Sequence, residues 1–326
     1  MKDTYQRDIN YLRVSVTDRC NLRCVYCMPA EGVQSTPHAE ILRIEEIEKI
    51  VRAASLIGVR KIRLTGGEPL VRKGIEDLVK RISDIPGIDD ITLTTNALLL
   101  PQRAAALKAA GVTRVNISLD TLQVARYREI TRGGDLAVAW EGIMAALDAG
   151  LHPVKINTVV LRGFNDDEVV AMARLTLNRP LHVRFIEVMP IGSQNNWTIG
   201  RFVPTEEIMS QITAKLGALQ PAKMPFGNGP AKYFKLKDAA GTIGFITSMS
   251  DHFCQSCNRL RMTSGGALRP CLYDAREVDL KTPLRSGASV EELAGLFMEA
   301  VALKPDRHHM QEGWHDRRRV MSQIGG

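Results

Sequence analysis

Hydrophobic and polar positions follow two alternating periods along the first 190 residues. Short runs rich in β-branched residues predict six strands, at Tyr11–Val16, Lys61–Thr65, Asp90–Thr94, Arg114–Leu119, Pro153–Val160 and Leu181–Val188. Amphipathic segments between them predict helices at Ile44–Ile57, Ile75–Ile82, Gln102–Ala110, Val138–Ala149 and Asp166–Leu177. Because a helical segment separates each pair of strands, we expect βαβ crossovers and a parallel sheet.

Six such units are too few for a closed eight-stranded α/β barrel, which leaves an incomplete barrel or a doubly wound sheet. We favour an incomplete parallel (β/α)6 barrel. After residue 190 the pattern changes to short strands, which predicts a smaller α+β domain of antiparallel strands. Its elements are expected at Lys232–Lys237, Thr242–Thr247, Asn258–Met262, Ala267–Leu272 and, as a helix, Val290–Leu303. The predicted domains are therefore residues 1–190 and 191–326.

The composition is that of a folded globular protein, with 44% hydrophobic and 24% charged residues. The formal net charge of +7 favours an anionic partner, such as a nucleotide, a nucleic acid or a membrane surface, without choosing among them. The first ten residues are charged and lack an apolar signal region, and no apolar stretch is long enough to cross a bilayer. We expect a soluble cytoplasmic protein that does not associate with membranes.

All six cysteines fall into two triplets, which predicts two metal sites. The first triplet, Cys20, Cys24 and Cys27, follows the first strand and so lies where α/β proteins build their sites. Its C-x3-C-x2-C spacing supplies three thiolates, whereas a [4Fe–4S] cluster normally takes four. One iron would then keep an open position for a chelating ligand. A structural zinc site completed by His38 or by a distant histidine is an equal alternative on the cysteine count alone.

The second triplet, Cys254, Cys257 and Cys271, has C-x2-C-x13-C spacing. A zinc site with His252 as the fourth ligand is the alternative here. Arg259 and Arg261 alternate on the strand that leaves this motif, so both point to one face. Two cations beside a metal site indicate an anionic ligand.

Four cations interrupt apolar strands of the first domain: Arg13, Arg63, Lys155 and Arg184. Strands of a parallel sheet are largely buried, and burying a cation without a partner costs several kcal/mol. Pairing with Asp120 or Glu187 would account for any one of them. Four together favour a polyphosphate across the barrel mouth, because the guanidinium group matches phosphate oxygens.

Several short segments together resemble one enzyme family. Tyr26 directly precedes the third cysteine of the first triplet, and Thr65-Gly-Gly-Glu-Pro69 follows the second strand. Asn116-Ile-Ser-Leu-Asp120, the Cys-x-x-Cys-Asn-Arg-Leu-Arg segment and a Gly-Gly end are also present. With both triplets, this combination is similar to the GTP 3′,8-cyclases, the radical S-adenosylmethionine (SAM) lyases that open molybdenum cofactor biosynthesis. The resemblance covers nearly the whole chain.

The resemblance implies a partial (β/α)6 barrel closed laterally by the second domain, with a [4Fe–4S] cluster on each triplet. SAM contacts would be Tyr26, Gly67, Ser118 and Met189. Contacts to GTP would be Arg13, Arg63, Thr94, Lys155, Arg184, Arg259, Leu260 and Arg261. Arg259, Arg261 and the terminal Gly325 and Gly326 would have catalytic roles. Terminal glycines are usually disordered, but two glycines are also narrow enough to enter an occupied site.

In the resembling family, a 5′-deoxyadenosyl radical takes the 3′ hydrogen of the GTP ribose, and C3′ then closes on C8 of guanine. The product is (8S)-3′,8-cyclo-7,8-dihydroguanosine 5′-triphosphate. The partners so implied are GTP, an electron donor such as flavodoxin or ferredoxin, the cyclic pyranopterin monophosphate synthase that acts next, and a second copy in a homodimer.

Two other functions compete with this interpretation. A radical SAM enzyme that docks a peptide is disfavoured because a peptide does not need several buried cations. A zinc protein that binds nucleic acid is supported by the net charge but opposed by the low aromatic content of 5% and the scattered basic residues. We therefore expect no nucleic-acid partner.

Overall fold

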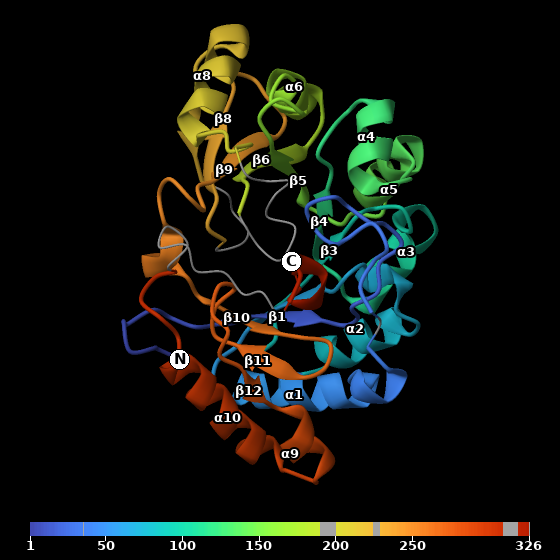
Figure 1. Ribbon diagram of the computed structural model, residues 1–326, viewed down its shortest axis with the longest axis vertical. Helices are drawn as coiled ribbons and strands as arrows, with labels where there is room; N and C mark the ends of the chain where they lie inside the picture. The colour runs from blue at the N-terminus through green and yellow to red at the C-terminus, as the bar shows by residue number, and fades with distance from the viewer. Residues whose placement is uncertain (35, 190–199, 224–228, 309–318, 326) are drawn as a thin grey trace.

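The computed structural model describes residues 1–34, 36–189, 200–223, 229–308 and 319–325 (Figure 1). Within them, one open sheet of 12 strands has the order β12-β11-β10-β1-β2-β3-β4-β5-β6-β9-β8-β7. The strands are β1 (Tyr11–Ser15), β2 (Lys61–Thr65), β3 (Asp90–Thr95), β4 (Arg114–Ser118), β5 (Val154–Val160), β6 (Leu181–Glu187), β7 (Gln220–Ala222), β8 (Lys232–Lys235), β9 (Thr242–Ile246), β10 (Arg259–Met262), β11 (Ala267–Arg269) and β12 (Val278–Asp279).

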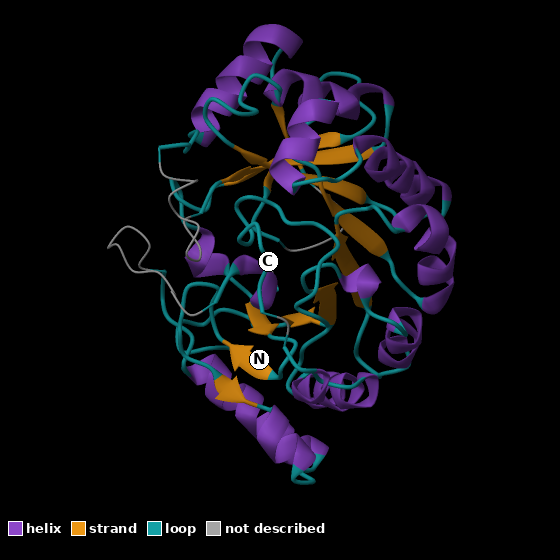
Figure 2. Ribbon diagram, turned by 45° about the vertical axis from the view of Figure 1, so that its right-hand side comes forward, coloured by secondary structure: helices purple, strands orange, loops and turns teal. Residues whose placement is uncertain are grey.

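Helices connect the strands and line the outer side of the curved sheet (Figure 2). The α-helices are α1 (Ile44–Leu56), α2 (Ile75–Ser83), α3 (Leu100–Ala110), α4 (Val124–Thr131), α5 (Leu136–Asp148), α6 (Val169–Asn178), α8 (Thr205–Leu216), α9 (Lys281–Arg285) and α10 (Val290–Ala302). Short 3₁₀ turns are η1 (His38–Glu40), η2 (Pro69–Val71), η3 (Phe253–Ser256) and η5 (Met321–Gln323).

The six predicted barrel strands are confirmed, each to within one residue at either end, and β1 to β6 pair in parallel with their neighbours. The sheet does not close on itself, as expected of an incomplete barrel. Alternation along each strand separates two environments, because successive side chains face opposite sides of a sheet. On β1, Leu12 and Val14 belong to the hydrophobic core, whereas Arg13 lies on the other, inner face.

The strands after residue 190 lie at both ends of the barrel sheet. The predicted antiparallel pairing holds for β7 with β8, β8 with β9, β10 with β11 and β11 with β12. However, β9 pairs in parallel with β6, and β10 pairs in parallel with β1. An open barrel leaves unpaired backbone groups at its two edge strands, and these later strands satisfy them.

Residues 319–325 return to the inside of the curved sheet, close to the C label of Figure 1. Ile324 is only 1% exposed and packs with Tyr273, and Gly325 is also buried. On the outside, α10 packs against α1 and begins with a capping box in which Ser289 and Glu292 bond to each other's backbone N–H groups. The C-terminal region thus contacts the barrel on both of its faces.

Candidate active site

The loop after β1 carries the first cysteine triplet. The backbone N–H groups of Arg23 and Val25 donate to the carbonyls of Thr131 and Ile130, at the end of α4. Arg132, in the left-handed region with φ 53°, donates from its guanidinium to the carbonyls of Arg23 and Met28. The loop is therefore fixed on both sides of Cys24 and Cys27.

The three thiols of this loop are close enough to affect one another. Burial raises the pKa of Cys24 well above its usual range, and Cys27 raises it further. Burial, followed by Cys20, raises the pKa of Cys27 to about 12. The N–H of Leu22 donates to the Sγ of Cys20 at 3.4 Å. Thiols with raised pKa values are protonated unless a bound metal stabilises the thiolate form. Three such thiols on one loop therefore fit an iron–sulfur cluster.

The glycines of the Gly-Gly-Glu-Pro segment pack against the chain itself. A Cβ on Gly66 would lie 2.5 Å from the carbonyl oxygen of Thr17, and one on Gly67 would lie 2.3 Å from that of Arg19. The N–H groups of Gly67 and Glu68 donate to the same two carbonyls at 2.8 Å. Close approach is thus required between this segment and the cysteine loop, independently of any ligand.

Glu68 connects this segment to the next strand. Its carboxylate accepts hydrogen bonds from the hydroxyl of Thr95 and the N–H groups of Leu70 and Asn96. Burial raises the pKa of Glu68 to about 7. The carboxyl ends of β2 and β3 are thereby held beside the first triplet.

The other predicted cofactor contacts lie around the same loop. The Tyr26 hydroxyl donates to Asp120 at 2.6 Å, and Asp120 also accepts from the N–H of Val159. Burial raises the pKa of Asp120 to about 6, although the bond from Tyr26 opposes the shift. Ser118 ends β4, and Met189 packs against the cluster formed by Tyr273 and Ile324.

Strand register brings cations together on the inner face. Arg13 of β1 pairs in register with Arg63 of β2 and with Arg261 of β10. Burial lowers the pKa of Arg13 well below its usual range, and the charges of Arg261 and Arg63 lower it further. Burial likewise lowers the pKa of Arg63 to about 10 and that of Arg261, beside Arg259, to about 9. Such a cluster favours an anion between its members.

The carboxylates that the sequence offered as partners are engaged elsewhere. Asp120 binds Tyr26, and Glu187 accepts from the hydroxyls of Thr205 and Ser250. Among the described residues, no carboxylate lies within ion-pair distance of Arg63, Arg184 or Arg261.

Further along the same sheet, Thr94 and Lys155 flank Asn116 in the strand register. Burial lowers the pKa of Lys155 to about 6, and the charge of Arg184 lowers it further. The ammonium group lies 5.4 Å from the centre of the Tyr233 ring. The hydroxyl of Thr94 and the Nε of Arg184 are buried without a hydrogen-bond partner in the described structure. Such atoms favour a polar ligand at this position.

The second triplet lies on η3 and at the ends of β10 and β11. The pKa of Cys257 is lowered to about 6, because the charges of Arg259 and Lys304 outweigh the effect of burial. Lys304 also donates to the carbonyls of Arg259 and Pro270, and so links the two ends of the motif. The Leu260 side chain is fully buried in the outer hydrophobic core, so only the backbone of this residue is available on the inner face of the sheet.

Two residues that sequence pattern did not single out support this second loop. Arg7 donates to the carbonyls of Cys254, Pro305 and Asp306 and forms a 2.6 Å ion pair with Asp3. Lys304 is the other. By sequence pattern both are ordinary surface residues. Only their low exposure, 6% for Arg7 and 3% for Lys304, shows that they are buried.

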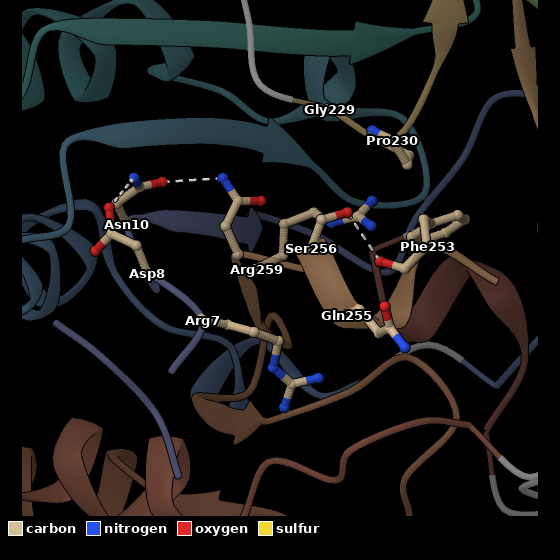
Figure 3. A pocket seen from close by; sticks show the side chains of 10 residues that line it. Arg7, Asp8, Asn10, Gly229, Pro230, Phe253, Gln255, Ser256 and Arg259 are labelled. Carbon is tan, nitrogen blue, oxygen red and sulfur yellow. Dashed lines mark hydrogen bonds between the residues drawn. The ribbon is translucent and has the colours of Figure 1, made fainter. Parts of the chain in front are cut away.

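A cavity of about 480 Å³ separates the amino-terminal segment from the second cysteine loop. Figure 3 shows Asp8 and Asn10 on one side and Phe253 and Gln255 on the other, with Arg259 between them. A second cavity of about 250 Å³ adjoins Cys20 and Arg19. Both cysteine loops therefore border open space.

Comparison with known proteins supplies the family. Residues 14–176 match the model of the radical SAM superfamily, and residues 181–310 match that of Molybdenum Cofactor Synthesis C. The GTP 3′,8-cyclase of Pelotomaculum thermopropionicum is 74% identical over 326 residues, covering 100% of both chains. That of Desulforamulus reducens is 58% identical over the same 326 residues and again 100% of both chains. The chain belongs to the GTP 3′,8-cyclase family.

The fold of this GTP 3′,8-cyclase family member is also found in solved structures. Streptococcus suis SuiB bound to S-adenosylmethionine matches with a TM-score of 0.62 at 14% identity, covering 88% of this chain and 72% of that one. At this identity the likeness shows the fold alone. Membership of the radical SAM superfamily implies SAM and a [4Fe–4S] cluster.

In the ranges that the structure describes, no three Cys, His, Asp or Glu side chains are arranged to hold one metal ion. His252 instead packs edge-on against His308, with ring centres 4.2 Å apart. Within the same ranges, none of the helices combines the length and apolar character that crossing a bilayer would need.

Proposed function

We propose that this chain converts GTP to (8S)-3′,8-cyclo-7,8-dihydroguanosine 5′-triphosphate, the first step of molybdenum cofactor biosynthesis. The observation that carries the proposal is the inner-face cation cluster, in which Arg13 pairs in register with both Arg63 and Arg261. Relatives that are 74% and 58% identical over the full chain bear the name GTP 3′,8-cyclase.

The first triplet would hold a [4Fe–4S] cluster, with SAM contacted by Tyr26, Gly67, Ser118 and Met189. When bound, the cluster and SAM supply a 5′-deoxyadenosyl radical by one-electron cleavage. The hydrogen bond from Tyr26 to Asp120 fixes the aromatic ring beside the cysteines. The contacts between Gly67 and the cysteine loop keep the end of β2 close to the same position.

The second triplet would hold a second [4Fe–4S] cluster that faces the guanine, with Arg259, the Leu260 backbone and Arg261 beside it. The low pKa of Cys257, about 6, supports this assignment because a thiolate is the form that binds iron. The division into residues 1–190 and 191–326 assigns one cluster to each part of the chain.

Arg13, Arg63, Thr94, Lys155 and Arg184 would bind the triphosphate and ribose. Their shared inner face and the unpartnered atoms of Thr94 and Arg184 support this role. Arg259, Arg261, Gly325 and Gly326 would act at the reacting centre. Gly326 lies outside the described residues.

Net chemistry requires one hydrogen to leave C3′ of the ribose and one bond to form between C3′ and C8 of guanine. The cyclised radical then takes one electron and one proton. The electrons would come from a flavodoxin or ferredoxin, and the product would pass to cyclic pyranopterin monophosphate synthase. The active protein would be a homodimer.

The test compares nucleotide with nucleoside. Lys155→Ala and Arg184→Ala should weaken GTP more than guanosine, by about 1.5–3 kcal/mol for each lost charged hydrogen bond. Lys215→Ala, at an exposed lysine of α8, is the matched control and should change neither affinity. Equal losses for GTP and guanosine would show that Lys155 and Arg184 serve the fold, and an enzyme that forms no cyclised product would contradict the proposed reaction.

A further inference from the structure

The side-chain amide of Asn116 is fully buried on the sheet. It is 0% exposed, and neither its Nδ2 nor its Oδ1 has a hydrogen-bond partner in the described structure. Its strand neighbours Val115 and Ile117 belong to the outer core, so the Asn116 side chain lies on the inner face of β4. Burying an amide without hydrogen bonds destabilises a fold, which calls for an explanation.

A second buried asparagine, Asn165, has a structural role, because its polar atoms bond to the protein itself. Asn165 is 2% exposed, and its Nδ2 donates to the carbonyls of Asp120 and Val159. Its Oδ1 accepts from the N–H of Leu161 at 2.7 Å. Both polar atoms of Asn165 are thus bonded within the protein, whereas Asn116 offers its Nδ2 as a donor and its Oδ1 as an acceptor to the barrel interior.

We propose that Asn116 is a specificity-determining residue that binds the ribose hydroxyls of the nucleotide. This inference rests on the proposed function. Phosphate oxygens only accept hydrogen bonds, so a triphosphate could satisfy Nδ2 but would leave Oδ1 unpaired. A vicinal diol satisfies both atoms, because one hydroxyl donates to Oδ1 while the other accepts from Nδ2.

The position of Asn116 agrees with a sugar. Along β4 it lies two residues, about 6.6 Å, before Ser118, the position proposed to contact SAM. The sugar that loses its hydrogen must lie next to that cofactor. In the sheet order β10-β1-β2-β3-β4, three strands separate Asn116 from Arg259 and Arg261, which are proposed to lie beside the guanine.

The neighbours of Asn116 in the register explain why the residue is neutral. Thr94 lies on one side and Lys155 on the other, and both are proposed to contact the same nucleotide. A carboxylate at this position would repel the triphosphate that these residues bind. An amide supplies directional hydrogen bonds without that repulsion.

The experiment measures binding of GTP, 2′-deoxy-GTP, 3′-deoxy-GTP and inosine triphosphate to the anaerobic holoenzyme with SAM. Wild type should bind GTP more tightly than at least one deoxy analogue. Asn116→Ala and Asn116→Val should weaken GTP roughly tenfold and abolish that preference, while binding of the affected analogue stays unchanged. Valine fits a strand and keeps the side chain close in size.

Thermal unfolding without nucleotide separates recognition from folding. Asn165→Ala should lower the melting temperature and leave the ratio of GTP to deoxy-GTP affinity intact. Asn116→Val should lower the melting temperature less, because it breaks no hydrogen bond within the protein. The inference is overturned if the Asn116 variants weaken GTP and both deoxy analogues equally, or if they change only the preference for GTP over inosine triphosphate. A wild-type holoenzyme that binds no GTP would instead contradict the proposed function itself.

Discussion

Arg261 donates a hydrogen bond from Nη1 to the carbonyl oxygen of Gly325 at 2.8 Å. The two residues are 64 positions apart, and the bond is buried. Arg261 also pairs in register with Arg13, so the residue that binds the C-terminal tail is itself a member of the inner-face cation cluster. Gly325 therefore lies beside the groups proposed to bind the nucleotide.

Gly325→Ala should impair cyclisation without preventing folding. Gly325 has φ 69°, and a Cβ there would lie 2.6 Å from the hydroxyl of Thr65. We expect cyclisation to fall roughly tenfold to a hundredfold, while SAM is still cleaved unproductively. Gly287→Ala is the control, because Gly287 has φ 94° and a Cβ there would meet no heavy atom within 4 Å. Chromatography of product and 5′-deoxyadenosine measures both reactions, and equal effects of the two variants would contradict a role for the tail.

Cys24→Ala and Cys257→Ala should separate the two proposed clusters. Each variant should lose about half of the roughly eight irons expected per chain, because the loops lie on different elements. Cys24→Ala should abolish SAM cleavage, whereas Cys257→Ala should retain cleavage and lose GTP turnover. Iron analysis and absorption spectra provide the measurement. Loss of all iron from either variant would argue against two independent sites.

GTP binding should take up a proton at Lys155. Its pKa of about 6 in the free protein lies below the ordinary 10.5, so the amine is mostly neutral at pH 7.5. A bound triphosphate favours the charged form, so affinity should fall as pH rises above 6, by at most about tenfold per pH unit. Calorimetry in buffers of different ionisation enthalpy should detect the uptake in wild type and not in Lys155→Arg. Because its pKa is depressed, Lys155 destabilises the folded, nucleotide-free protein most below pH 6. This destabilisation declines as the pH rises toward 10.5.

Arg7→Ala should loosen the second cysteine loop. The Arg7 and Asp3 side chains are 4% and 0% exposed, and breaking such a buried pair costs about 3–5 kcal/mol. The variant also loses the bond to the Cys254 carbonyl. We expect iron at the second triplet to fall while SAM cleavage persists. Arg60→Ala, which breaks the exposed ion pair with Asp89, is the control and should retain all iron.

Local pattern predicted much of this fold. The strands of the barrel alternate strongly, and β2 matches its predicted bounds of Lys61–Thr65. Among the described elements, three α-helices were not predicted: α4 is short and highly charged, α8 follows an irregular segment, and α9 has only five residues. The edge strands β7 and β12 have three and two residues and exist only because a neighbour pairs with them.

What the sequence by itself determined is the set of chemical groups: two cysteine triplets, the cations inside apolar strands, and the family resemblance that comparison confirmed. These signals are local, because spacing and alternation are properties of adjacent residues. Only the tertiary structure decided that β9 and β10 extend opposite edges of one sheet, that Arg7 and Lys304 support the second loop, and that Gly325 reaches Arg261. Each depends on contacts between distant segments, and such contacts leave no periodic trace along the chain.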